Sequence, residues 1–169
     1  MSVRATVKAI QDIMRQDAGV DGDAQRISQL RWMFFLKILD DQDQALEMMQ
    51  PGYTSPLPES LRWGAWAADP EGATGETLLA FINEKLFPGL KELPLAGANR
   101  PRRRVVRSVF EDAYNYMKSG YLLRQVANKI NEVDFNNLAD KQHFGDVYEQ
   151  LLNDLQSAGT PESTTRRVP

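Results

Sequence analysis

The residues with the clearest chemistry are arginines that gather where a helix is expected to begin: Arg100, Arg102, Arg103, Arg104 and Arg107. Cations at a helix N-terminus oppose the helix dipole, so local stability does not favour this placement. The planar fork of arginine suits phosphate, and the free amides of a first helical turn add donors. Two interpretations stay open: contact with the DNA backbone, or pairing with carboxylates of the same chain.

The other candidates for catalysis or ligand binding have simpler explanations. Residues 72–77 look like a phosphate loop, but Glu76 stands where the phosphate-binding lysine is required, so we expect a turn and a helix cap. His143 is the only histidine and the chain has no cysteine, which favours a packing or surface role. Residues 21–23 resemble the start of a calcium loop, but Arg26 occupies a later ligand position. With no glycine loop for a nucleotide either, we expect no cofactor or metal in this chain.

Composition sets the broad class. The 169 residues suit a single domain with a real core, and 42% hydrophobic with 25% charged residues is typical of globular proteins. Zero cysteines, no apolar signal segment and no run long enough for a membrane span favour a cytoplasmic location. The net charge of -3 argues against an autonomous DNA binder, so any contact with DNA is expected within a larger assembly.

The dominant sequence period is helical. Apolar residues at Ile10, Ile13 and Met14 predict a first helix, and a wide apolar stripe over 27–39 predicts a second helix that is buried on most sides. Asp23 is predicted as its N-cap. The acidic run of Asp40, Asp41 and Asp43 is interpreted as the point where this helix leaves the core for solvent.

Two irregular connections interrupt the helices. Residues 51–75 are rich in Pro and Gly, but Trp63 and Trp66 predict that this connection is pinned to the core. A short helix over 78–86 is expected to start after Thr74 as cap and to stop at 88–89. A second connection, 93–101, leads to helices near 105–117, 120–133 and 141–157. The fold class is therefore all-α, a single-domain bundle of about six helices over 1–157, with a disordered polar tail over 158–169.

Two segments carry a family resemblance: Gln29-Leu-Arg-Trp-Met-Phe-Phe-Leu-Lys-Ile-Leu-Asp-Asp41, and the stretch from Ser119-Gly-Tyr-Leu-Leu-Arg124 to Phe144-Gly-Asp-Val-Tyr-Glu-Gln-Leu-Leu152. Together they resemble the N-terminal helical domain of the modification (DNA methyltransferase) subunit of type I restriction-modification systems. The resemblance covers roughly residues 4–157.

The resemblance implies an N6-adenine methyltransferase as the intact parent, working with a specificity subunit, a second modification subunit and DNA. S-adenosylmethionine would bind the parent's catalytic domain, which in the family follows the helix equivalent to Asp146–Glu149. Tyr148 and Glu149 are therefore interpreted as residues that dock the catalytic domain or a neighbouring helix, although a core role for the tyrosine fits its spacing as well.

The last residues, 159–169, depart from the family pattern. They resemble a frame-shifted version of the expected Gly-Glu-Phe-Tyr-Thr-Pro-Arg segment, so we expect an interrupted gene with a methyltransferase frame directly downstream.

The expected function is a non-catalytic interaction module that helps a type I complex close around DNA. A free-standing adaptor or regulator that binds a protein partner is the alternative. An independent transcription factor ranks last, because the net charge is negative and Gln125, Asn128 and Lys129 offer only a thin recognition face.

Overall fold

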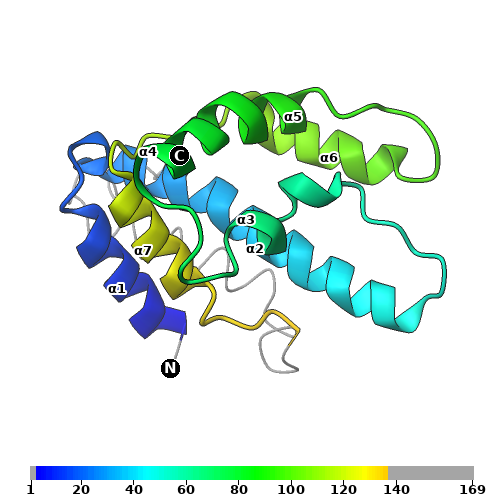
Figure 1. Cartoon of the computed structure of the whole chain (residues 1–169), viewed down its shortest axis with the longest axis horizontal. Coiled ribbons are helices and arrows are strands. Elements are labelled where there is room, and N and C mark those ends of the chain that lie inside the picture. The colour runs from blue at the N-terminus through cyan, green and yellow to red at the C-terminus, as the bar shows by residue number, and fades with distance from the viewer. Residues whose placement is uncertain (1–2, 137–169) are drawn as a thin grey trace, which may run out of the picture.

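The computed structural model describes residues 3–136, and all of its regular elements in that range are helices (Figure 1). In chain order they are α1 Val3–Met14, η1 Ala18–Val20, α2 Asp23–Met49, η2 Glu59–Leu61, α3 Trp63–Trp66, α4 Gly75–Phe81, the π turn η3 Ile82–Leu86, α5 Phe87–Lys91, α6 Arg100–Glu111 and α7 Gly120–Ile130. The predicted all-α class is confirmed. The helix predicted over 141–157, the tail over 158–169, and His143, Tyr148 and Glu149 lie outside the described residues.

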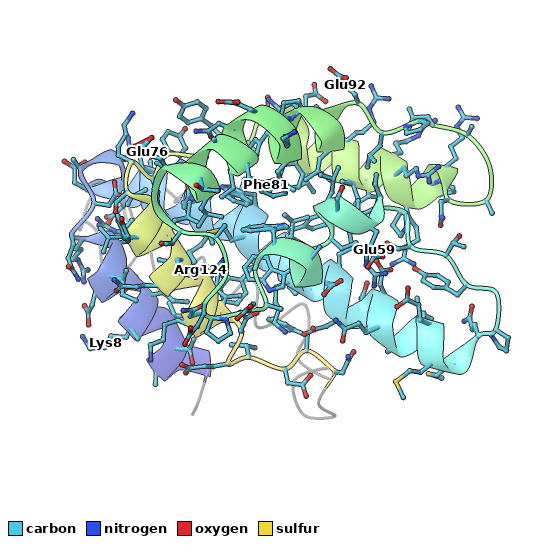
Figure 2. All side chains as sticks on the ribbon, viewed as in Figure 1. Lys8, Glu59, Glu76, Phe81, Glu92 and Arg124 are labelled. Carbon is cyan, nitrogen blue, oxygen red and sulfur yellow. The ribbon has the colours of Figure 1, made fainter. Side chains whose placement is uncertain are left out.

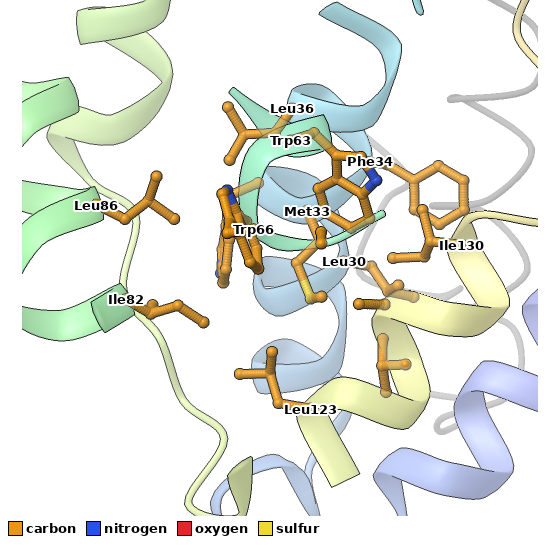
Figure 3. Packing of buried hydrophobic residues seen from close by; sticks show 14 of the residues in the cluster. Leu30, Met33, Phe34, Leu36, Trp63, Trp66, Ile82, Leu86, Leu123 and Ile130 are labelled. Carbon is orange, nitrogen blue, oxygen red and sulfur yellow. The ribbon is translucent and has the colours of Figure 1, made fainter. Parts of the chain in front are cut away.

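The long helix α2 runs through the molecule, with α4 to α6 on one side and α1 and α7 on the other (Figure 1). Its apolar stripe is buried as predicted, because elements pack on several of its faces. Figure 3 shows Ile82 and Leu86 facing this core from one side, and Leu123 and Ile130 from the other. An aromatic cluster lies at the centre, where the ring of Trp32 packs 4.9 Å from that of Phe87 and 6.4 Å from that of Trp66.

The ends of α2 differ from the prediction. Gly22 is the N-cap, while Asp23 is the first helical residue and pairs with Arg26. At the other end the helix does not leave the core at the acidic run but continues to Met49. The predicted solvated helix end is wrong, since Asp40, Asp41 and Asp43 are only 4%, 6% and 0% exposed. The sequence of this acidic segment could not reveal that Tyr53, Arg62 and Arg102, from other parts of the chain, cover this turn.

The connection between α2 and α4 is pinned as predicted. Trp63 and Trp66 are 2% and 8% exposed, and the indole of Trp63 donates a 2.7 Å hydrogen bond to Asn131 Oδ1. Thr74 is the N-cap of α4, although its hydroxyl donates to Gly120 O at 3.3 Å and caps no amide.

The sequence suggested that the helix after Thr74 stops at the Pro-Gly pair of residues 88–89, but the helix that starts at Gly75 continues past this pair. It passes through the π turn η3 into α5 and ends at Lys91. Pro88 falls in the first turn of α5, where its missing amide is tolerated. The change of hydrogen-bond register at the π turn thus lets this helical segment accommodate Pro88, which would disrupt the interior of an unbroken α-helix.

Helix α6 starts at Arg100, five residues earlier than predicted, and ends at Glu111 rather than near Met117. Residues 113–119 have no helical structure and are held by side chains from elsewhere in the chain. The buried carboxylate of Asp17 accepts bonds from the backbone amides of Gly19 at 2.8 Å, Lys118 at 3.0 Å and Ser119 at 2.8 Å. Ser119 then caps α7, which begins at Gly120 as predicted, by accepting a bond from Leu122 N at 3.2 Å.

Candidate functional site

The five arginines lie in the first two turns of α6, a helix that has no acidic residue in its first turn. The packing of α6 against α5 turns one face of the helix inward and leaves the other toward solvent. The arginines consequently divide into two groups with different surroundings.

Three of them contact the two irregular connections. Arg102 donates to the hydroxyl oxygen of Tyr53 and lies 3.7 Å from the carboxylate of Asp43. Arg103 donates to Pro56 O at 2.8 Å and to Ala96 O at 3.4 Å. Arg107 donates to Leu93 O at 3.2 Å. Of the two interpretations left open by the sequence, pairing within the chain therefore holds for Arg102, while backbone carbonyls are the partners of Arg103 and Arg107.

The other two arginines, Arg100 and Arg104, are exposed. Within residues 3–136 neither has a hydrogen-bond or ion-pair partner. Their guanidinium groups are free to meet an external anion, so this pair is the part of the predicted arginine set that is open to a phosphate backbone.

Arg102 neutralises one of the acids that the sequence analysis had placed in solvent. The carboxylate of Asp43 is fully buried and accepts bonds from Tyr53 Oη at 2.6 Å and Ser55 Oγ at 2.5 Å. Burial of Tyr53 and its bond to Asp43 raise the pKa of the phenol to about 12. The group therefore ties α2, the 51–62 connection and α6 together, because α2 supplies Asp43, the connection supplies Tyr53 and Ser55, and α6 supplies Arg102.

The two neighbouring acids have their own cations. Asp41 accepts a 2.8 Å bond from Lys37 one turn earlier, and Asp40 accepts a 3.3 Å bond from Arg62. Burial raises the pKa of Asp40, although the guanidinium of Arg62 acts in the opposite direction. These acids are structural, since each carboxylate is already satisfied by groups of the chain.

Two open hollows lie beside α5, and the first of them includes arginines of α6. The first, of about 370 Å³, lies between α5 and α6 and is lined by Lys91, Leu95, Arg104, Arg107, Ser108 and Glu111. The second, of about 560 Å³, lies beside it at the junction of α5 with the 113–115 segment and shares Lys91. No grouping of His, Cys, Asp or Glu suited to a metal ion occurs among the described residues.

The remaining sequence candidates are accounted for as structure. Residues 72–77 form a turn followed by the first turn of α4, with Glu76 exposed, so the expected turn is present and Thr74 stands at the N-cap position without a capping bond from its side chain. The thin recognition face on α7 is largely occupied, because Asn128 donates to Pro70 O at 3.4 Å and Lys129 pairs with Glu132 at 3.3 Å. In residues 3–136 we find no helix with the length and apolar character that crossing a membrane requires.

Sequence reasoning missed Arg124, which is 5% exposed and donates four hydrogen bonds to backbone carbonyls. It lies between α7 and the turn that precedes α4 (Figure 2). Burial lowers the pKa of its guanidinium. The only signal for it was an arginine on the otherwise apolar face of a helix, within the segment that carries the family resemblance.

Comparison with known proteins decides the family. A family model described as the HsdM N-terminal domain matches residues 3–130. The chain belongs to this family. The HsdM N-terminal domain match contains α1 to α7, all five arginines of α6 and both hollows.

The relatives of this HsdM N-terminal domain are subunits of type I restriction systems. The chain is 54% identical over 172 residues to the type I restriction enzyme EcoEI methylase subunit of Escherichia coli, a match that covers 98% of the chain and 35% of that protein. The chain spans about a third of the relative's length. The match therefore does not assign the relative's activity to this chain.

Two solved structures share the fold of this HsdM N-terminal domain. One is a crystal structure of a modification subunit assigned to a type I restriction enzyme of Vibrio vulnificus YJ016, with 34% identity and a TM-score of 0.83 over 95% of this chain and 36% of that chain. The other comes from a study of complex assembly and conformational transition in the type I restriction-modification system, with 30% identity and a TM-score of 0.72 over 91% of this chain and 30% of that chain.

Proposed function

We propose that this domain is the interaction module of a type I modification subunit. It holds a specificity subunit and a second modification subunit and helps the assembly close around DNA in the cytoplasm. The observation that carries the proposal is the family match over residues 3–130, supported by the likeness to a protein solved in work on type I complex assembly. Methyl transfer and S-adenosylmethionine binding belong, in this proposal, to the catalytic domain of the parent subunit.

Assembly is tested by co-expressing the chain with the specificity and modification subunits of its own restriction system. We expect the chain to elute with these subunits in size-exclusion chromatography. It would then occupy the position that the N-terminal domain of an intact modification subunit otherwise takes in the complex. A modification subunit that lacks the residues equivalent to 3–130 is the control, and it should fail to assemble. Elution of the chain alone at its 19.1 kDa mass would contradict the proposal and favour an unrelated adaptor.

The DNA role is assigned to Arg100 and Arg104, the two arginines without a partner among the described residues. Each exposed guanidinium that neutralises a phosphate releases a counterion, at about 0.9 units of the slope of log K against log salt. The chain's net charge of -3 opposes DNA binding by the domain alone, so the contact belongs to the assembled complex.

Replacing Arg100 and Arg104 with alanine in the modification subunits is expected to weaken DNA binding by the assembled complex. The salt slope should fall by about 2 for each copy of the domain, because two phosphate contacts are lost. The measurement is fluorescence anisotropy of a labelled duplex over a range of salt concentrations. Alanine at Lys8 and Arg31, which are exposed cations on α1 and α2, removes the same charge from other elements and serves as the control. An equal slope of log K against log salt in the two double variants would show that Arg100 and Arg104 of α6 do not contact DNA.

A further inference from the structure

The hollow between α5 and α6 concentrates positive charge in an acidic chain. Lys91 reaches it from the end of α5, and Arg104 and Arg107 reach it from one face of α6. Glu111 is the only acid among the six lining residues. The lining therefore carries three cations against one anion, whereas the whole chain has a net charge of -3.

These cations are not used up by the fold. Within the described range neither Lys91 nor Arg104 has a hydrogen-bond or ion-pair partner, and no ion pair joins Arg107 to Glu111 one turn later. Arg107 is half-buried and donates one Nη to Leu93 O at 3.2 Å, which fixes its guanidinium at the edge of the hollow and leaves further N–H groups to donate.

The spacing of the arginines on α6 costs the helix stability. Arg100 and Arg104 stand one turn apart, as do Arg103 and Arg107, and like charges at this spacing repel each other. No acid in the first turn offsets them. An anion bound at this face would remove the repulsion, so the local energetics favour a ligand of high negative charge.

We infer that the α5–α6 hollow binds a phosphate group, which is seated between Lys91, Arg104 and Arg107. Arginine donates from a planar fork that fits phosphate, lysine adds a point charge, and the exposed hydroxyl of Ser108 adds a further donor. A hollow of about 370 Å³ has room for the sugar or second phosphate to which that group is attached, with Leu95 as an apolar wall. For a phosphate of the DNA backbone the inference rests on the proposed function; for a free phosphate ester it stands by itself.

The first arm of the test uses the full 169-residue chain and pyrophosphate at constant ionic strength, followed by the NMR shifts of backbone amides. We expect saturable shifts at Lys91, Leu95 and Ser108. Lys91→Gln should weaken binding about two- to fivefold, and Glu111→Gln should tighten it by a similar factor, because exposed charges contribute a few tenths to 1 kcal/mol. Lys85→Gln and Glu84→Gln make the same charge changes at exposed positions outside the hollow and should leave the affinity unchanged.

The second arm distinguishes the sources of the anion. If Lys91→Gln also weakens duplex binding by the assembled complex, the phosphate comes from DNA. If it affects pyrophosphate alone, the hollow takes a free phosphate ester, and the inference stands without DNA. A Glu-rich peptide that binds the chain more tightly than pyrophosphate, with the same dependence on Lys91 and Glu111, would show that the hollow takes a protein carboxylate and would overturn the inference.

Absence of saturable pyrophosphate shifts, or equal affinities in the Lys91→Gln and Glu111→Gln variants, would also overturn it. Neither result touches the proposed function, because the assembly experiment changes no residue of the hollow and reports on that function by itself.

Discussion

Replacing Arg124 with methionine is expected to destabilise the domain by about 3–5 kcal/mol, because a buried hydrogen-bonded cation is removed from the carbonyls that it satisfies. Its guanidinium donates to Ala73 O at 2.9 Å, Ala67 O at 3.1 Å, Asp69 O at 3.0 Å and Trp66 O at 2.8 Å. Through these four bonds one side chain of α7 fixes the whole turn from α3 to α4.

The four carbonyls do not depend on Arg124 equally. Ala67 O also accepts a 2.8 Å bond from Asn131, and Asp69 O accepts a 2.9 Å bond from Gly72 N. Trp66 O and Ala73 O have no second donor among the described residues. The loss therefore comes mainly from two carbonyls left without a partner, at about 1–3 kcal/mol each.

The measurement is equilibrium unfolding in urea, followed by tryptophan fluorescence. For a chain of this size the midpoint of thermal unfolding should fall by about 10 °C, at roughly 2–4 °C per kcal/mol. The stability of the Arg124→Lys variant should lie between that of the parent protein and that of the methionine variant, since a single ammonium group cannot reproduce the planar fork of arginine. Gln125→Met, at the exposed neighbouring position, is the control. A free energy of unfolding within about 0.5 kcal/mol of the parent protein in the methionine variant would show that the turn is held without Arg124.

Alanine at Gly120 is expected to destabilise the domain by about 3 kcal/mol or more, since it introduces a clash between two backbones. A Cβ at this position would lie 1.9 Å from the carbonyl oxygen and 2.5 Å from the carbonyl carbon of Gly75, so α7 would have to move away from the start of α4. No side chain can rotate to relieve this contact, because the atoms that it meets belong to the main chain.

The movement is also detectable locally. The bond from Thr74 Oγ1 to Gly120 O, at 3.3 Å, should be lost. Urea denaturation gives the loss of stability, and amide hydrogen exchange at the start of α7 gives its location. Gly64→Ala on α3 is the matched control, because its Cβ would come no closer than 3.0 Å to its nearest neighbour, a side-chain oxygen of Asp40, and would meet no backbone atom of another segment. Equal stability of the two variants would contradict the close packing of α4 on α7.

Much of the fold could be predicted from the sequence because its signals are local. The wide apolar stripe over 27–39 predicted a helix buried on most sides, and α2 confirms it. Two tryptophans in a Pro- and Gly-rich connection predicted that this connection is pinned to the core, since exposed indoles would gain nothing there. Two segments far apart in the chain were enough for the family resemblance, which the family match confirms.

The surroundings of charged side chains could not be predicted, because they depend on segments distant in sequence. The sequence placed five arginines together at the start of one helix, but only the packing of α6 turned Arg102, Arg103 and Arg107 toward the irregular connections. It also showed an acidic run on α2, and only the return of the chain supplied Arg62, Tyr53 and Arg102 to bury it.

The sequence by itself thus determined the helical class, the buried face of α2 and the family, because apolar periodicity and motif residues act within one or two helical turns. The tertiary structure alone decided which cations are spent on the fold and which stay available to a ligand. An arginine carries the same charge in either setting, and whether a carbonyl, a carboxylate or water lies within reach is fixed only when distant segments meet.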